Sequence, residues 1–314
     1  MSSLSARPIQ SRSYFASACA VVPPSGDPQA ERSPQPASQP AAAAAPAPVA
    51  TPAPSPTPAA LPPARFVYSG ELTQGGWVRG TAPIGTTALT LDGEPVQMAA
   101  DGSFLAAFDR DAGGTATLAA TRSDGTTATQ LLTISPRDWQ IEHINAARRT
   151  GGPSESFMQR RRPELERIYG ARAMETGAEG WRQDFIWPVR GRISGRFGSQ
   201  RIYRGEPGRY HTGLDIAPGA GTHYVAPADG VVVLAADDFS LEGNLLIIDH
   251  GNGLNSAFLH SQRLDVKQGD RVTQGQQLGL IGSSGRATGP HLHWSLMWGK
   301  ARLDPLLFVA PGDG

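Results

Sequence analysis

The hydrophobic and polar positions of the chain alternate most regularly between residues 66 and 135. Short runs such as FVYSGEL, GGWVRGTA and TALTLDG are separated by three Asp-Gly pairs at 92, 101 and 124. Asp-Gly between alternating runs is a strong signal for a hairpin turn. The pattern predicts a small antiparallel β-sandwich over residues 65–135, which contains no histidine, no cysteine and no carboxylate cluster of a catalytic site.

Residues 136–183 follow a different pattern. Ile141, Ile144 and Ala147 recur at helical spacing, and the run SFMQRRRPELERIYGARAMETGAEGW is dense in charge and poor in apolar residues. Such a composition is typical of an exposed connecting helix. We interpret this segment as a helical linker, and its arginines at 160–162 as a solvated helix face rather than a patch that binds an anionic surface.

Alternating runs return in the last segment, residues 184–314, and two histidines stand in one of them. The run GPHLHW places His291 and His293 on either side of Leu292. In an extended strand, positions i and i+2 face the same way, so the two imidazoles share one face. They can bind one metal together, or act as one ligand and one proton carrier, or be two half-buried histidines of an ordinary strand.

A second run, YHTGLDIAPG, supplies His211 and Asp215. These residues would be roughly 13 Å apart in an extended chain, so the chain must bend between them, and Gly213 is the residue that can bend it. With His293 they form a set of two imidazoles and one carboxylate with a fourth position left for water, which is the ligand set of a catalytic zinc site. His260, at the end of LNSAFLH, and His291 remain as the general acid and base candidates. A His-Glu-x-x-His helix is absent from the sequence.

These residues resemble the lysostaphin-type (LytM-like) zinc endopeptidases, which cut peptide bonds in bacterial peptidoglycan. The resemblance covers residues 187–308 and rests on HTGLDIA, SAFLH and GSSGRATGPHLHW, with GRFGSQR and VKQGDRVTQGQQLGLIG beside them. It implies a mainly β protein whose metallopeptidase domain is an antiparallel sheet of the duplicated hybrid motif type. It also implies one Zn²⁺ per chain on His211, Asp215 and His293, with His260 and His291 catalytic. The substrate would be a stem or cross-bridge peptide of peptidoglycan.

Other interpretations compete with this one. The strongest is a non-catalytic relative that acts as a regulator or a wall-binding adaptor, although such proteins typically lose metal ligands and all five positions are intact here. A biotinyl or lipoyl carrier would need a lysine at a hairpin tip, and the only lysines, Lys267 and Lys300, lie in no such turn signal. A serine hydrolase would need Gly-x-Ser-x-Gly, which GSSGR does not supply.

The three remaining histidines have no motif partner. We expect His143 to be structural or exposed, His223 to lie in a surface loop and His250 to be associated with a turn.

The N-terminal segment, residues 1–64, is expected to be a disordered tether. It holds 15 of the 27 prolines, interleaved with alanine and serine. Small residues precede Cys19 as they do at the end of an export signal, but the apolar core of such a signal is missing. Three explanations stay open: a start site placed too far downstream, a degraded signal, and a disordered tail with an incidental cysteine. From the inferred substrate we expect the protein to be exported and to work in the cell envelope. The N-terminus is the candidate position for a membrane anchor.

Charge and hydropathy argue against two further classes of protein, those that bind nucleic acid and those that span a membrane. The formal net charge is zero, and residues 184–314 carry 12 Lys/Arg against 12 Asp/Glu, which argues against nucleic acid as a partner. No run of about 18 apolar residues exists, so no transmembrane segment is expected.

Overall fold

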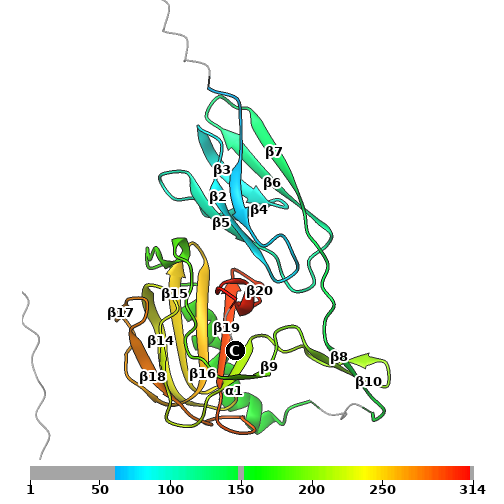
Figure 1. Ribbon diagram of the computed structural model, residues 1–314, viewed down its shortest axis with the longest axis vertical. Helices are drawn as coiled ribbons and strands as arrows, with labels where there is room; N and C mark the ends of the chain where they lie inside the picture. The colour runs from blue at the N-terminus through cyan, green and yellow to red at the C-terminus, as the bar shows by residue number, and fades with distance from the viewer. Residues whose placement is uncertain (1–60, 148–151, 312–314) are drawn as a thin grey trace, which may run out of the picture. The chain divides into compact units, whose positions relative to one another are not determined.

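A computed structural model describes residues 61–147 and 152–311 of the 314-residue chain (Figure 1). The tether, the export signal and Cys19 lie outside the described residues, apart from the last four residues of the tether segment. All described residues belong to one compact unit. They form a mainly β protein with a single α-helix, so the predicted fold class is confirmed for this part of the chain.

The first part of the described chain contains two antiparallel sheets with the strand orders β1-β2-β5 and β4-β3-β6-β7. Their strands are Val67–Gly70 (β1), Trp77–Thr81 (β2), Thr86–Leu91 (β3), Glu94–Val96 (β4), Ser103–Ala107 (β5), Thr115–Arg122 (β6) and Thr127–Thr133 (β7). Apolar side chains from both sheets, including Phe104, Leu118 and Leu132, form a buried cluster. Asp92 and Gly93 both have positive φ in the turn between β3 and β4, as a two-residue hairpin requires.

The segment after these sheets contains a strand where the sequence predicted a helix. Residues Ile141–Ile144 form β8, which pairs in parallel with Gln200–Tyr203 (β10), and β10 pairs with the short strand Glu206–Pro207 (β11). The helical spacing of Ile141 and Ile144 was therefore a wrong indication, because pairing with a strand about sixty residues later outweighs a local pattern. The three strands form an arm that stands beside the main sheet (Figure 1).

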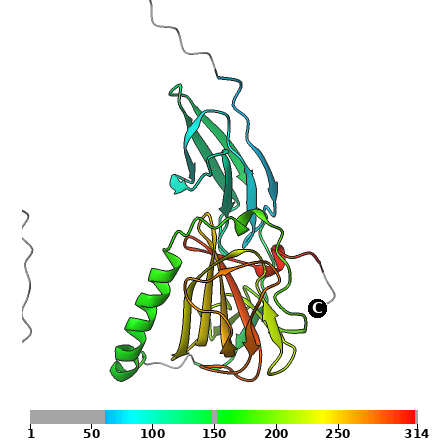
Figure 2. The same cartoon turned by 90° about the vertical axis from the view of Figure 1, so that its left-hand side faces the viewer.

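The α-helix Glu155–Arg172 (α1) begins at Ser154, whose side chain accepts a hydrogen bond from the Phe157 amide. Figure 2 shows α1 along one side of the main sheet, where Ile168 and Ala171 join a buried cluster with residues of β14, β15 and β16. The interpretation of 160–162 as a solvated face fails at its middle residue. Arg161 is buried and forms ion pairs with Glu164 and Glu242, so α1 is attached to the sheet by charge as well as by apolar contact.

The rest of the chain forms a ten-stranded antiparallel sheet, whose longest path has the order β17-β14-β15-β16-β19-β12-β9. Its strands are Arg192–Gly195 (β9), Leu214–Ala217 (β12), His223–Val225 (β13), Gly230–Phe239 (β14), Gly243–Gly251 (β15), Leu254–Leu264 (β16), Arg271–Val272 (β17), Gln277–Ile281 (β18), Leu292–Trp298 (β19) and Ala301–Leu303 (β20). Two 3₁₀ helices, Gly180–Arg182 (η1) and Pro305–Leu307 (η2), flank it in sequence. The strand-rich interpretation of this segment is thus confirmed.

The core of the main sheet extends into the first part of the chain. Its buried cluster includes Phe258, Trp294 and Leu296, and Leu105 and Ala107 of β5 belong to the same cluster. Trp77 of β2 donates a hydrogen bond from Nε1 to the carbonyl oxygen of Leu307 at 2.8 Å. The β5 face and the end of the chain therefore share one apolar core.

Among the described residues, no helix is both long and apolar enough to cross a membrane.

Candidate metal centre

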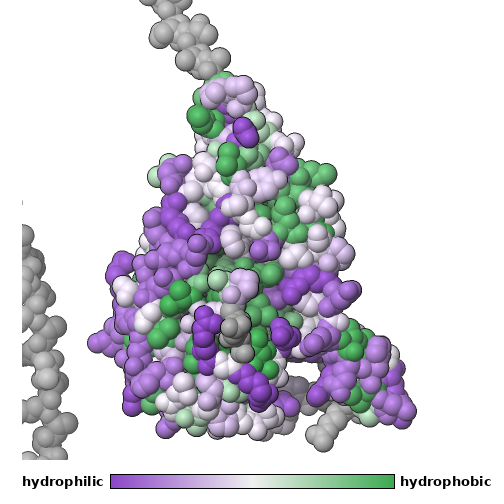
Figure 3. Space-filling model, viewed as in Figure 1, coloured by the Kyte–Doolittle hydropathy of each residue, from purple (hydrophilic) through white to green (hydrophobic). Residues whose placement is uncertain are grey.

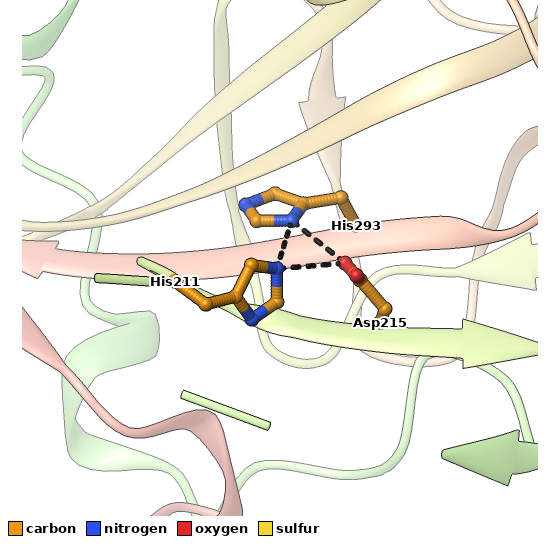
Figure 4. Close-up of side chains that lie close together, drawn as sticks. All are labelled: His211, Asp215 and His293. Atoms are coloured by element: carbon orange, nitrogen blue, oxygen red, sulfur yellow. Dashed lines mark hydrogen bonds and ion pairs between the residues drawn. The ribbon is translucent and has the colours of Figure 1, made fainter. Parts of the chain in front are cut away.

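The structure brings His211, Asp215 and His293 together although they are far apart in the sequence (Figure 4). Asp215 lies on β12 and is the direct antiparallel neighbour of His293 on β19, while His211 lies in the loop that enters β12. Asp215 Oδ1 is 3.1 Å from His211 Nε2 and 2.8 Å from His293 Nδ1, and the two nitrogen atoms are 3.1 Å apart. Pairing of β12 with β19 thus assembles the group.

The role of Gly213 differs from the one that the sequence suggested. Its φ does not lie in the left-handed region, so the bend does not depend on a special backbone angle. A Cβ atom at this position would instead stand 2.5 Å from the carbonyl oxygen of Trp294 and 2.7 Å from His293 Nε2. Glycine is needed here because the His293 ring packs directly against the backbone.

The hydrogen bonds of His211 decide which of its nitrogen atoms is free. His211 Nδ1 lies 3.1 Å from the carbonyl oxygen of Arg196, and since a carbonyl oxygen only accepts, Nδ1 is the donor. In the neutral ring, Nε2 then presents a lone pair to the Asp215 carboxylate. Two acceptors cannot face each other at 3.1 Å without a proton or a metal cation between them. Arg196 belongs to the run GRFGSQR, and only its carbonyl oxygen makes this contact.

Donor type and spacing both fit a metal such as zinc. Ligand atoms in a tetrahedral zinc site, each about 2.0–2.1 Å from the ion, stand about 3.3 Å from one another. The three donor atoms are 2.8–3.1 Å apart, so a small outward movement would accommodate an ion. Two imidazoles and one carboxylate are also a donor set that zinc prefers.

The charges in the group are strongly coupled. Burial alone would raise the pKa of Asp215, but the hydrogen bonds from His211 and His293 lower it far below its ordinary value. Burial works to lower the pKa of His211, yet the hydrogen bond to Asp215 raises it overall. Burial lowers the pKa of His293 despite the same carboxylate. The group therefore holds an ionised carboxylate at neutral pH, ready to bind a cation.

His291 and His260 lie next to this group. His291 Nε2 is 3.7 Å from Asp215 Oδ1, so His291 and His293 point to the same carboxylate, as the His-x-His spacing predicts. The ring centroids of His260 and His291 are 4.9 Å apart. Each ring donates a hydrogen bond from Nδ1 to a backbone carbonyl oxygen at 2.8 Å. His291 donates to Gly289 and His260 donates to Ser284. Their Nε2 atoms are consequently proton acceptors when the rings are neutral.

A backbone irregularity at His260 orients its ring. The residue has φ of 67° in the middle of β16, which is uncommon for a residue other than glycine. Its amide donates to the carbonyl oxygen of Glu242, and the register of β16 shifts nearby against β15 and β18. Burial lowers the pKa of His260, and the neighbouring His291 and His293 add to this, so the ring is neutral at pH 7.

The structure keeps the other three histidines away from this site. His143 is exposed, as expected, and His223 is exposed on the strand β13 rather than in a loop. The interpretation of His250 as a turn residue was wrong, because it is fully buried in β15. There its Nδ1 donates to the carbonyl oxygen of Asp229 and its Nε2 accepts from the Ser256 hydroxyl, both at 2.7 Å.

A groove of about 1560 Å³ opens beside His211 and Asp215. Its opposite wall comes from the arm, with Gln140 just before β8, Glu142 on β8 and Tyr203 on β10, and Figure 3 shows the opening between the arm and the main body. These groove residues were not predicted from the sequence because the spacing of apolar residues over 141–147 indicated a helix. The alternation of WQIEHI was the signal that could have placed them on a strand.

The antiparallel sheet and the His/Asp/His group together define a β domain that carries a candidate metal centre. Residues 209–305 match the model for Peptidase family M23. The chain therefore contains a peptidase domain of family M23, as the resemblance to LytM-like enzymes implied.

Two curated proteins illustrate the similarity in sequence, and one solved structure illustrates the similarity in fold. Peptidoglycan DD-endopeptidase ShyA of Vibrio cholerae is 40% identical over 110 residues, which are 34% of this chain and 25% of that protein. ShyC of the same organism, also named a peptidoglycan DD-endopeptidase, is 39% identical over 122 residues, 38% of this chain and 28% of that protein. This chain thus spans about a quarter of the length of these curated relatives.

The crystal structure of a Pseudomonas aeruginosa protein assigned to peptidase M23 matches with a TM-score of 0.58 and 26% identity, over 76% of this chain and 95% of that one. This match extends well beyond residues 209–305, so the similarity in fold includes elements outside the peptidase domain.

Proposed function

We propose that this protein is a zinc-dependent endopeptidase that hydrolyses peptide cross-links of bacterial peptidoglycan. The observation that carries the proposal is the convergence of three atoms that can each bind a metal, His211 Nε2, Asp215 Oδ1 and His293 Nδ1, which are 2.8–3.1 Å apart. Such a group can hold a cation in place of the protons between its members, and its ligand types favour zinc. One ion per chain would be held there.

A zinc ion bound by such a donor set acts as a Lewis acid and makes a water molecule nucleophilic at neutral pH. Contacts that the proposed ligands make with the backbone support a role in holding zinc. His211 is oriented by the carbonyl oxygen of Arg196, and Gly195 lies so close to Asp215 that a Cβ there would stand 2.5 Å from Oδ2. Partners of this kind keep the ligands in position before the ion arrives.

We assign proton transfer to His291 and His260. Among the described residues no hydrogen-bond donor contacts His291 Nε2, which lies close to Asp215 Oδ1, so His291 takes the proton of the attacking water as general base. His291 then passes this proton to the leaving amine. His260 Nε2 can only accept in the neutral ring, so it stabilises the developing oxyanion after the ring has taken a proton from solvent, and it returns that proton when the oxyanion collapses.

The proposed substrate class rests on the family and on the groove. ShyA and ShyC are named peptidoglycan DD-endopeptidases, and the groove beside His211, of about 1560 Å³, is large enough to hold a peptide. Such a substrate places the working protein in the cell envelope, outside the cytoplasm. The match with family M23 and the two-histidine acceptor pair both favour a peptidase over a regulator or adaptor that only binds the wall.

The test is hydrolysis by the purified full chain loaded with one equivalent of zinc. Soluble cross-linked muropeptide dimers of two kinds, with a direct D-Ala–diaminopimelate link and with a glycine bridge, would be incubated with it and the products identified by mass. We expect cleavage of the cross-link in one kind and none after removal of the metal. Stoichiometric zinc without hydrolysis of either dimer would reject the enzyme and favour the non-catalytic regulator.

A further inference from the structure

A second hollow, of about 520 Å³, lies between α1 and the main sheet and is also lined by His293 of the metal centre. His293 and Ser295 of β19 form part of its wall, and Arg172 of α1 and Arg302 of β20 form another part. Arg209 lines both this hollow and the groove beside His211. A peptide that passes the metal centre can therefore reach the hollow.

Positive charge exceeds negative charge among the described residues that line this hollow. The only carboxylate among the described residues that line it is Glu242, which is already paired with Arg161 at 2.5 Å. Arg172 donates to the neutral side-chain oxygen of Asn255 at 2.8 Å. Within residues 61–147 and 152–311, Arg172, Arg209 and Arg302 form no ion pair.

Two of these arginines also repel each other. Burial lowers the pKa of Arg172 to about 10, and the positive charge of Arg302 contributes to the shift. A half-buried cation that faces a like charge is unfavourable until an anion joins it. Guanidinium groups bind carboxylates through two parallel hydrogen bonds, so a pair of them forms a specific carboxylate site.

We propose that this hollow binds a free carboxylate of the peptide substrate, held by Arg172 and Arg302 with Arg209 at the entrance. The proposal rests on the proposed function. It makes α1 part of the substrate site, although α1 precedes the residues that match the peptidase family. Such a site would favour anionic cross-linked peptides over neutral glycine bridges, because glycine bridges carry no carboxylate beside the scissile bond.

Two carboxylates of a cross-linked dimer could occupy the site, the one on the diamino acid beside the cross-link and the one at the C-terminus. We would compare three dimers: one with both carboxylates free, one amidated at the diamino acid and one amidated at the C-terminus. The wild-type full chain, zinc-loaded, should show a KM roughly 10- to 100-fold higher for one amidated form, with kcat little changed. The amidated dimer whose KM rises identifies which carboxylate the hollow binds.

Variants connect this preference to the hollow. Arg172→Gln and Arg302→Gln should raise KM for the free dimer and lose the preference, whereas Arg172→Lys and Arg302→Lys should restore part of it. Arg160→Gln, at an exposed arginine on the same helix, is the matched control and should keep the full preference. Thermal unfolding of each variant checks the fold, and Arg302→Gln is expected to be at least as stable as the wild type because it removes a repulsion.

Binding separates this proposal from the proposed function. Calorimetric Kd values for the three dimers would be measured with the same zinc-loaded proteins. If no dimer is cleaved but wild type binds the free form at least ten times more tightly and Arg172→Gln does not, the enzyme proposal fails and the carboxylate site stands. Equal Kd and KM for all three dimers, or an unchanged preference in both glutamine variants, overturns the carboxylate site.

Discussion

His291 Nε2 lies 3.7 Å from Asp215 Oδ1, whereas His293 reaches the same oxygen with Nδ1 at 2.8 Å. Two imidazoles from one short run thus approach one carboxylate oxygen at different distances. The nearer one is placed to share a cation with Asp215. The other lies farther from the carboxylate and would face a small molecule held beside a cation at this site.

This difference predicts separate phenotypes for the two histidines. His293→Ala removes one of the three proposed metal ligands, so zinc content and activity should fall together, with some loss of stability because metal binding contributes to folding. His291→Ala should keep zinc and the fold but lower turnover by roughly 10²- to 10⁴-fold. Zinc analysis beside turnover on soluble muropeptides measures both. Equal zinc loss in the two variants would make His291 a ligand and leave His260 as the base.

Gly213 provides a test of how tightly the ligand His293 is held. A Cβ at this position meets Trp294 and His293 at distances well below normal contact, so Gly213→Ala must displace the ring. We expect a loss of about 1–3 kcal/mol from overpacking and a zinc affinity reduced roughly 10- to 100-fold. Gly170→Ala on α1 meets no atom within 4 Å and should leave zinc affinity unchanged. Wild-type zinc affinity in Gly213→Ala would show that the site is looser than its geometry indicates.

The His-x-His pair and the strands around it could be predicted from the sequence because their signals are local. Alternation places His291 and His293 on one face whatever the rest of the chain does, and Asp-Gly turns define hairpins over a few residues. The Asp215 neighbour was found by the same means, through a spacing of four residues from His211. What the alternation could not supply was the pairing of β12 with β19 that brings the two runs together.

The features that were missed depend on partners distant in the sequence. Arg161 belongs to a charged helix face by local pattern, and only the position of Glu242 makes it a buried ion pair. Ile141 and Ile144 fit a helix until β10 offers a parallel partner. His250 in IDHGNG has the composition of a turn, but Asp229 and Ser256 satisfy both of its nitrogen atoms inside the sheet. Tertiary contacts outweigh local preference in each case.

His250 predicts a pH dependence of stability. Burial lowers the pKa of His250 to about 4 in the folded protein, against about 6.5 in the unfolded chain. Between these values the unfolded state binds more protons, so the stabilisation present above pH 6.5 is lost as pH falls towards 4, by roughly 3 kcal/mol at most. Urea unfolding of the metal-free protein between pH 4.5 and 7.5 measures this. His250→Gln should be less stable at pH 7 and show a flatter dependence, while His143→Gln, at an exposed histidine, should keep the wild-type slope.

The peptidase domain should depend on the segments before it. A fragment of residues 184–314 keeps all proposed site histidines and Asp215, so we expect it to bind zinc. It loses Ile168 and Ala171, which cover one sheet face, and also buried Trp181 and Leu105 of the shared core. Its urea midpoint should therefore lie clearly below that of residues 61–314, which in turn should match the full chain. Identical midpoints for the two fragments would mean that these contacts contribute no stability.

The backbone at His260 allows its side chain and its conformation to be tested separately. A φ of 67° is unfavourable for any residue with a Cβ atom by about 1–3 kcal/mol, and glycine adopts it freely. His260→Gly and His260→Ala remove the same imidazole, so both should reduce turnover similarly and leave zinc bound. They should differ in stability, with the glycine variant more stable than the alanine variant by about 1 kcal/mol or more in urea unfolding. This order is opposite to the one expected within a regular strand, where glycine destabilises. A more stable alanine variant would show that β16 relaxes to ordinary strand geometry without the ring, and that the imidazole's bond to the Ser284 carbonyl, not the chain, sets the conformation of His260.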